Sequence, residues 1–367
     1  MSKNTGIAIV GGGPSGLLLA RMLYLKGVPF TVFERDESPL HRPQGGMLDL
    51  HPETGQYAMK RAGLFAEFQK FARYEDQGMR LYDKHGTLVY GNDASEGDRP
   101  EIDRSQLRDL LVQSIPQDAI RWGHRLSQAV QLEDGATELR FENGAVEQFD
   151  FVVGADGAWS KVRPLVSDIR PGHMGLTMYE LSIDDADTRH PEVAALVGRG
   201  TAVAKGDGRS IFAQRNANAH IRVYAALPRQ EEAFLVETKA SLLAHFADWD
   251  NKLLQLLHAG EDDVRPWPIY ALPVGHSWEN RAGVTLIGDA AHLMPPAGEG
   301  ANLALRDAAD LADALTGNGD QASAVRAYEA AMFVRAKVSA GQAMEAFAAG
   351  SAEDSLEVVR KRVSGEL

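Results

Sequence analysis

A glycine-rich stretch near the start of the chain has residue types and spacing suited to binding an anion. It reads Gly11-Gly12-Gly13-Pro14-Ser15-Gly16 and lies between two apolar runs, at 7–10 and 17–23. This order predicts a buried strand, a tight turn and a helix whose first-turn N–H groups and positive dipole end face a ligand. In such a turn Gly11 permits the tight bend, Gly13 lets a pyrophosphate approach the backbone, and Gly16 lets helix and strand pack closely. Proline suits the first helical turn, where its missing N–H is not needed.

An acidic residue follows at the distance that such a turn requires. A second apolar run at 29–33 ends in Glu34, about 20 residues beyond the glycines, where a carboxylate that accepts from ribose hydroxyls is expected. Together the turn and Glu34 predict a dinucleotide site. They specify neither the dinucleotide nor the reaction.

Two later segments have a similar order of residues. In each, an apolar strand is followed by small residues and an aspartate. One runs from 151 through Gly154 to Asp156, and the other from 284 through Gly288 to Asp289. The second leads into a predicted helix that begins near Gly298. Asp289 could be an ordinary helix N-cap, but its position after a buried strand favours a ligand role. For Asp156 the N-cap and ligand interpretations are about equal.

The elements between these segments place further polar side chains. Asp103 and Gln106 predict a capping box that opens a helix to about residue 114. Arg104 would then occupy the first helical position, where the dipole disfavours a cation unless it has an anionic or polar partner. His292 fits a packed loop histidine better than a catalytic one.

The sequence pattern in the second half of the chain is typical of an antiparallel sheet. Short alternating runs lie at 176–183, 201–204, 210–214 and 221–226, separated by polar turns. In the last run Arg222 and Tyr224 share one face, which could be solvated or could roof a ligand pocket. Apolar residues at helical spacing predict one helix over 241–258, and a long helix over 322–349.

Composition limits the function classes. The chain has 367 residues, a formal net charge of −13 and no cysteine. The acidic balance argues against nucleic-acid and anionic-membrane partners, and the absence of cysteine excludes disulfides, thiolate metal sites and a redox-active CxxC pair. No secretory signal or apolar run of membrane-spanning length is visible, so we expect a cytoplasmic location. We also expect a monomer, and no metal site.

At this point the chain resembles the FAD-dependent aromatic-hydroxylase-like monooxygenases, the group that includes para-hydroxybenzoate hydroxylase. The motifs that carry the resemblance are GGGPSG at 11–16, GADG at 154–157 and GDAAHLMPP at 288–296. Further stretches look like their counterparts in the tetracycline-inactivating flavin monooxygenases: GGMLDLH at 45–51, PEIDRSQLR at 100–108, SKVR at 160–163 and AHFADWD at 244–250.

The resemblance implies an α/β fold with a Rossmann-like FAD-binding domain of the para-hydroxybenzoate hydroxylase type, an inserted antiparallel-sheet substrate domain and a long C-terminal helix. The expected FAD-binding domain is discontinuous, with segments 1–75, 100–170 and 275–320. The substrate-binding domain would comprise 76–99 and 171–274, and the C-terminal helix 321–367. FAD would be the resident cofactor, with NADPH and O2 as co-substrates.

The same resemblance implies that residues from many parts of the chain bind the cofactor. It also implies that the flavin carries the chemistry, so that no side chain needs to act as a catalytic nucleophile. Arg35 and Arg42 would lie near the adenosine or the nicotinamide cofactor, Asp49 and Arg104 near the ribityl–isoalloxazine side, and the turn at 298–302 near the flavin pyrimidine edge. The implied cofactor residues are Gly11, Gly13, Pro14, Ser15, Gly16, Glu34, Arg35, Arg42, Asp49, Arg104, Asp156, Asp289, Gly298, Gly300, Ala301 and Asn302.

The resemblance further implies hydroxylation of an electron-rich phenolic or enolic carbon through a flavin C4a-hydroperoxide, with a tetracycline or related polycycle as the substrate. The expected substrate contacts are Glu180, Ser182, Arg222 and Pro296. Glu180 and Ser182 stand where the drug-binding enzymes carry amides, and the loop PPAGEGAN is one residue shorter than usual. A hydroxylase of another aromatic metabolite, a flavin reductase of the same fold and a non-catalytic flavin- or ligand-sequestering protein therefore remain alternatives.

Overall fold

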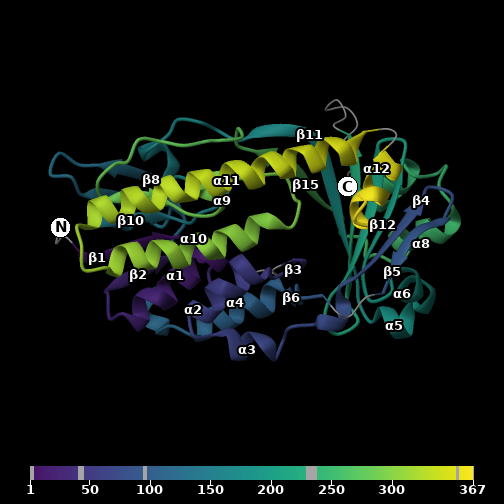
Figure 1. Cartoon of the computed structure of the whole chain (residues 1–367), viewed down its shortest axis with the longest axis horizontal. Coiled ribbons are helices and arrows are strands. Elements are labelled where there is room, and N and C mark those ends of the chain that lie inside the picture. Colours follow the sequence, from purple (N-terminus) through teal and green to yellow (C-terminus); the bar gives the residue numbers. More distant parts are fainter. Residues whose placement is uncertain (1–3, 40–44, 94–96, 229–237, 353–354, 367) are drawn as a thin grey trace.

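The chain is described by a computed structural model at residues 4–39, 45–93, 97–228, 238–352 and 355–366. Two sheets lie at opposite ends of an elongated molecule, and two long helices run beside the first of them (Figure 1). This arrangement confirms the predicted α/β fold class, with a Rossmann-like sheet, a second, mostly antiparallel sheet and a long C-terminal helix. Among the described residues, no helix has the length and apolar character needed to cross a membrane.

The first sheet carries the glycine turn. Its parallel strands follow the order β7-β2-β1-β10-β16, and the antiparallel strands β9 and β8 continue from the N-terminal part of β10. The central strands are buried on both faces, which explains their unbroken apolar runs. The bounds are β1 Asn4–Val10, β2 Phe30–Phe33, β7 Ile120–Arg121, β8 Leu126–Gln131, β9 Thr137–Phe141, β10 Val146–Gly154 and β16 Val284–Leu286.

The second sheet has the order β15-β11-β14-β13-β12-β4-β5, with one parallel pairing between β12 and β4. Alternate residues of β11, β13 and β14 pack into an apolar core with the short helices α5 to α8. The bounds are β4 Gly78–Asp83, β5 Leu88–Asn92, β11 Gly172–Ile183, β12 Gly200–Gly206, β13 Arg209–Arg215, β14 Ile221–Pro228 and β15 Arg265–Ala271. The predicted strands in this half of the chain are confirmed.

Helices cover the first sheet and connect it with the second. The helix α1 packs against α10, which packs against α11. The α-helices are α1 Pro14–Leu25, α2 Tyr57–Arg61, α3 Phe65–Gln69, α4 Arg104–Gln113, α5 Ala186–Arg189, α6 Pro191–Val197, α7 Lys239–Ala244, α8 Asn251–His258, α9 Asp289–His292, α10 Glu299–Thr316, α11 Gln321–Ser351 and α12 Ser355–Val363. Further short elements are β3 Met47–Asp49, paired with β6 Glu101–Asp103, a π-helix at Pro52–Gln56, and 3₁₀ turns at Tyr74–Asp76, Gln117–Ala119 and Arg163–Leu165.

The long helix α11 reaches from the first sheet to the second (Figure 1). At its far end the buried Lys205 of β12 donates to the Gly350 carbonyl at 2.6 Å and to Ser210 Oγ at 2.8 Å. A cation at a helix C-terminus is favoured by the helix dipole. This contact fixes the last turn of α11 against the second sheet.

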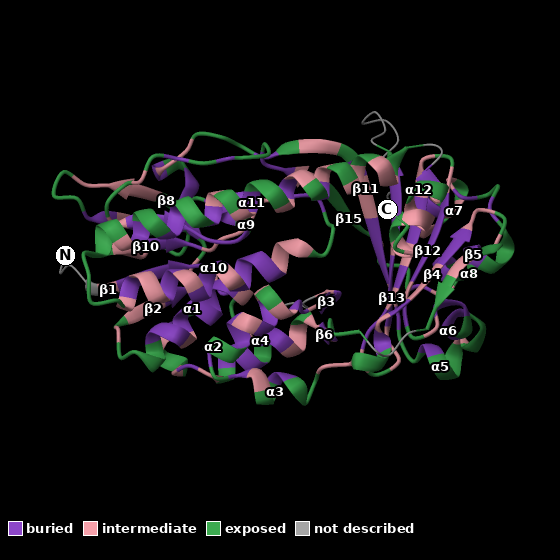
Figure 2. Cartoon of the chain, in the orientation of Figure 1, coloured by how far each residue is buried: buried purple, intermediate pink, exposed green. Residues whose placement is uncertain are grey.

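One predicted helix is wrong. The segment 241–258 forms two helices, α7 and α8, because Asp250 adopts an extended backbone and caps α8. The Asp250 carboxylate accepts from Lys252 N–H at 2.8 Å, while its own N–H donates to the Lys84 carbonyl at 3.0 Å. The apolar spacing was still informative, since Leu242, Phe246 and Leu253 are all buried. Figure 2 shows how buried and exposed residues are distributed along the helices and strands. The predicted domain boundaries are not tested by these observations and stay a prediction.

The core of the second sheet leads to a stability prediction. Phe246 is fully buried and packs edge-on against Trp249, with ring centroids 5.0 Å apart. We expect Phe246→Ala to lower the free energy of unfolding by about 3–5 kcal/mol, because it leaves a cavity. Urea unfolding followed by circular dichroism measures the change, and Phe71→Ala is the matched control at an exposed ring. A loss below about 1 kcal/mol, no larger than that of the control, would contradict this packing.

Candidate functional site

The glycine turn is held by backbone contacts that leave no room for side chains. A Cβ on Gly11 would lie 2.2 Å from the Ala155 carbonyl oxygen, and a Cβ on Gly16 would lie 2.1 Å from the Gly11 oxygen. Gly11 also has a φ of +113°, which L side chains rarely adopt. Gly13, by contrast, faces open space with nothing within 4 Å of a built Cβ. The turn therefore packs tightly against β10 and stays open at the start of α1, as a bound pyrophosphate would require.

Glu34 is buried and holds the turn from the next strand. Its Oε2 accepts from the Gly12 N–H at 2.6 Å, and its Oε1 accepts from the Asp36 N–H at 2.9 Å. Each carboxylate oxygen has a second lone pair, so both can still accept from a hydroxyl group. Arg35 is exposed. Arg42 lies outside the described residues.

A buried arginine that the sequence analysis did not single out supports the same loop. Arg108 of α4 pairs with Asp36 at 3.1 Å and donates to the Pro39 carbonyl at 2.9 Å. Both charged side chains are almost fully buried. The sequence did contain a signal for this pair. Arg108 follows Leu107 on the apolar face of a helix, and a charge buried on such a face needs a partner.

The loop after β10 is a capped turn. Asp156 Oδ2 accepts from the Lys161 N–H at 2.7 Å, and burial raises the pKa of this carboxyl. The other oxygen, Oδ1, is buried and has no hydrogen-bond partner in the described part of the chain. This is the geometry of a turn-capping residue, and the predicted cofactor role of Asp156 stays a prediction.

The glycine turn and the two later glycine–aspartate segments converge at one edge of the first sheet. The strands β1, β10 and β16 are adjacent and parallel, so their C-terminal ends emerge together. A Cβ built on Gly288 would lie 3.3 Å from Ser15 Oγ, and one on Gly300 would lie 4.0 Å from Asp289 Oδ1. The N-termini of α1 and α10 thus meet the turn that carries Asp289.

Asn302 ties the start of α10 to β3. Its Oδ1 accepts from His51 N–H at 2.9 Å and from Gly55 N–H at 3.2 Å, and its Nδ2 donates to the carbonyls of Asp49 and Gly298 at 2.7 and 3.1 Å. The side chain is buried. All four of these bonds are internal, so any contact of this turn with a cofactor is left to the backbone.

His51 lies between two carboxylates at the same place. Its Nε2 is 2.8 Å from Asp49 Oδ2 and its Nδ1 is 3.3 Å from Glu299 Oε1. Burial alone would lower the pKa of this histidine, but the two carboxylates outweigh burial and raise it to about 9. His51 is therefore an imidazolium at neutral pH. The sequence analysis quoted this residue only as part of a motif.

The second sheet presents polar groups toward this edge. Glu180 of β11 and Arg222 of β14 form a buried ion pair, and a Cβ on Gly45 would lie 2.8 Å from Arg222 Nη1. Tyr224 lies beside the next glycine, since a Cβ on Gly46 would lie 3.0 Å from its hydroxyl oxygen. Burial and the negative charge of Glu180 raise the pKa of Tyr224 to about 12, so it remains a hydroxyl donor.

Ser182, Arg104 and Pro296 are the other predicted residues. Ser182 is half-buried and sits opposite Arg222 in the β11–β14 register. Arg104 is exposed at the start of α4, where its N–H donates to the Gly46 carbonyl at 3.1 Å. Pro296 is exposed in the loop that leads into α10. The structure thus brings Glu180, Ser182 and Arg222 together on one sheet face.

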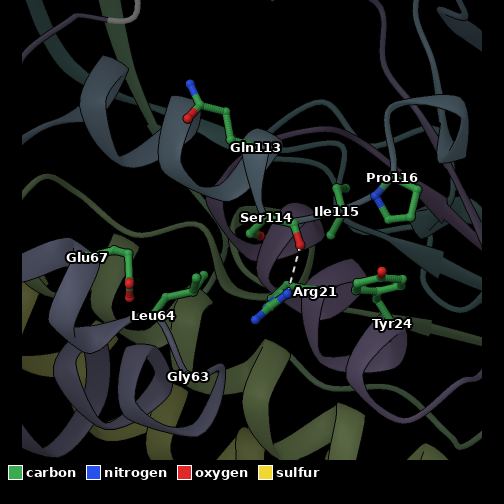
Figure 3. A pocket seen from close by; sticks show the side chains of 9 residues that line it. All are labelled: Arg21, Tyr24, Gly63, Leu64, Glu67, Gln113, Ser114, Ile115 and Pro116. Carbon is green, nitrogen blue, oxygen red and sulfur yellow. Dashed lines mark hydrogen bonds between the residues drawn. The ribbon is translucent and has the colours of Figure 1, made fainter.

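A surface hollow elsewhere contains none of the predicted site residues (Figure 3). Arg21 of α1 lies in it and donates to the Ser114 carbonyl at 2.9 Å and the Ala62 carbonyl at 3.2 Å. These carbonyls end α4 and α2, so Arg21 caps two helix C-termini. The hollow is explained by the packing of helix ends.

The fold and the converging helix N-termini define a dinucleotide-dependent oxidoreductase with a second sheet beside its cofactor edge. The chain belongs to the FAD binding domain family, which matches residues 4–337. It is a flavin-dependent monooxygenase with FAD as its cofactor, and NADPH and O2 are the usual co-substrates of this class.

Known proteins of this class are similar over most of the chain. Monooxygenase asqM of Emericella nidulans is 31% identical over 370 residues, covering 84% of this chain and 83% of the relative. The structure of Klebsiella pneumoniae HpxO complexed with FAD and uric acid superposes with a TM-score of 0.80 at 21% identity, over 97% of this chain and 92% of that one. Tetracycline destructase Tet(51) superposes with a TM-score of 0.75 at 20% identity, over 98% and 95%. At these identities the two structures show a shared fold.

The glycine contacts predict opposite outcomes for two similar variants. Gly16→Ala places a methyl group against the Gly11 carbonyl, so we expect the apoprotein to unfold at a clearly lower temperature. Gly13→Ala meets open space, so we expect its apoprotein to keep the parent stability while FAD affinity falls at least about 10-fold. Differential scanning fluorimetry and titration of apoprotein with FAD measure the two effects. Equal melting temperatures for the two variants would contradict the turn geometry.

His51 gives a pH prediction with a defined sign. Its folded pKa of about 9 lies above the ordinary histidine value of 6.5, so its contribution to stability is full below about pH 6.5 and disappears as the pH rises through 9. We expect His51→Gln to lower the free energy of unfolding by up to roughly 3 kcal/mol at pH 6 and by much less at pH 10. Urea unfolding of the parent and of His51→Gln between pH 6 and pH 10 gives the difference in their free energies of unfolding. The contributions of titrating groups that both proteins share cancel in this difference. A difference that is independent of pH would show that His51 is not charged.

Proposed function

We propose that FAD lies along the edge where the three segments converge. The open space at Gly13 and the start of α1 suits the pyrophosphate, and Glu34 suits the adenosine ribose. Asp289 and the N-terminus of α10 then face the ribityl chain and the flavin ring. The contact between Gly288 and Ser15 supports this arrangement, because it brings the two helix N-termini to one continuous edge.

The bound flavin supplies hydride acceptance and oxygen transfer, and this chain supplies orientation and charge. The first-turn N–H groups of α10 point toward the proposed pyrimidine edge, where a positive helix end stabilises negative charge. Asn302 holds that turn with four hydrogen bonds, so its donors are preorganised. Arg104 is exposed and its N–H donates to the Gly46 carbonyl, which supports the proposed contact of this side chain with the flavin.

We propose an electron-rich phenolic or enolic polycycle, a tetracycline or a related compound, as the substrate. The observation that carries this proposal is the sheet face formed by Glu180, Arg222 and Tyr224 beside the loop at 45–46. Arg222 is neutralised by Glu180, and its buried Nε–H has no hydrogen-bond partner in the described residues. One N–H donor without a net charge suits a carbonyl or enol oxygen better than a carboxylate. The fold shared with Tet(51) supports the same class.

A smaller aromatic substrate is the second candidate. It is supported by the fold shared with HpxO, whose structure was determined with uric acid, and which superposes with a higher TM-score than Tet(51). The bulk of Tyr224 at the sheet face also favours a smaller ring.

Mass spectrometry of the product separates these candidates. Purified holoenzyme is given NADPH, air and either a tetracycline panel or simple phenols, with NADPH consumption recorded at 340 nm. We expect substrate-dependent NADPH consumption and a mass gain of one oxygen atom on a tetracycline. A gain on phenols alone would contradict the polycycle proposal. NADPH consumption without any oxygenated product would identify a reductase, and no consumption would favour a sequestering protein.

A further inference from the structure

Asp307 of α10 makes three contacts, two of which hold the turn after β16. It is almost fully buried, and its Oδ2 accepts from the Gly288 N–H at 3.1 Å and lies 2.5 Å from His292 Nε2. Its Oδ1 lies 3.4 Å from the Arg335 guanidinium of α11. The two partners in the turn are the residues immediately before and at the end of α9, Asp289–His292.

The carbonyl groups of the same turn are bound by two other side chains. Arg163 donates from Nε to the Ala290 carbonyl at 2.7 Å and from Nη2 to the Asp289 carbonyl at 3.1 Å. His276 Nδ1 lies 2.8 Å from the Ala291 carbonyl. A carbonyl only accepts, so this nitrogen carries the proton. Backbone groups of four consecutive residues in the turn are therefore fixed by side chains from distant parts of the chain.

The electrostatics make Asp307 the centre of this group. Burial alone would lower the pKa of His292, but the Asp307 carboxylate and its hydrogen bond outweigh burial and raise it. Asp307 and His292 thus form a buried, hydrogen-bonded pair in which the carboxylate favours the charged form of the imidazole. Removing one partner of such a pair leaves the other charge buried and unpaired. The turn consequently depends on Asp307 more than on a single neutral hydrogen bond.

We propose that Asp307 is a positioning residue for FAD, which fixes the turn that presents Asp289 between the N-termini of α1 and α10. This inference rests on the proposed role of Asp289 in holding FAD. The turn lies against both helices, since Ser15 Oγ is 3.3 Å from a Cβ built on Gly288 and Asp289 Oδ1 is 4.0 Å from one built on Gly300. A shift of the turn would therefore move Asp289 relative to both proposed cofactor contacts.

Neighbouring Asp310 provides a matched control. It lies one turn further along α10 and binds Arg335 at 3.0 Å and Arg306 at 2.9 Å. It shares the Arg335 contact with Asp307, and no hydrogen bond to the turn 288–292 is found for it among the described residues. Asp310→Asn thus perturbs the same helix and the same arginine without removing support from the turn.

The experiment titrates apoprotein with FAD and follows the quenching of flavin fluorescence. We expect Asp307→Ala to raise the FAD dissociation constant about 10- to 100-fold, because a hydrogen-bonded charge is lost. Asp307→Asn can keep one oxygen at the position that the Gly288 N–H and His292 Nε2 share, so we expect a smaller rise and a partial rescue. We also expect the visible absorbance of the bound flavin to shift in Asp307→Ala, and Asp310→Asn to stay within about 3-fold of the parent.

Each outcome has a distinct meaning. If Asp307→Ala and Asp307→Asn lower apoprotein stability but leave FAD affinity and the flavin spectrum unchanged, the positioning role is wrong. An Asp310→Asn effect as large as that of Asp307→Asn would also overturn it. Asp307→Asn covers the case in which Asp307→Ala does not fold. Asp289→Ala separates the two proposals, since an unchanged affinity there would contradict the proposed role of Asp289 itself.

Discussion

The close backbone contact between the glycine turn and β10 is the constraint on which the site depends. Neither Gly11 nor Gly16 can carry a side chain, because the Ala155 and Gly11 carbonyl oxygens occupy that space. This contact sets where α1 begins relative to the sheet. The neighbouring strands β10 and β16 then end at the same edge, and their following loops are brought to the start of α1. A shift of one strand would separate all three motifs.

Two helix N-termini at that edge explain how a chain with a negative net charge can bind an anionic cofactor. The net charge is −13, and carboxylates of Asp49, Asp289 and Glu299 lie close to the start of α10. Backbone N–H groups at helix starts supply positive potential without side-chain charge. The His51 imidazolium offsets two of the neighbouring carboxylates. Local geometry therefore decides the electrostatics of this edge, and the overall charge does not.

The elements and motif residues could be predicted from the sequence because they depend on local patterns. Apolar runs, glycine spacing and a strand-ending aspartate identified both sheets and the converging segments. The view of His292 as a packed histidine agrees with its burial against Asp307. The one element predicted wrongly, the helix over 241–258, failed where Asp250 binds Lys84, a partner far away in the sequence.

The side chains that hold the loops of the site in place could not be predicted, because their partners lie far away in the sequence. Arg108 binds Asp36, Arg163 binds the carbonyls of α9, and Asp307 binds Gly288, and each pair is remote in the chain. A single sequence shows that a charge falls on an apolar stripe, but it does not name the partner. Glu180 and Arg222 were expected to contact a substrate separately, whereas the β11–β14 pairing joins them to each other.

That ion pair also connects the two sheets. Gly45 and Gly46 lie against Arg222 and Tyr224, and the same loop continues directly into β3, which carries Asp49. Asp49 in turn contacts His51, and its carbonyl accepts from Asn302 at the start of α10. The contacts therefore lead from the ion pair in the second sheet to the start of α10 through one short strand. Because the Glu180–Arg222 pair is buried and the later contacts are at least part-buried, there is little space for adjustment along this path, and we expect the two sheets to be coupled through it.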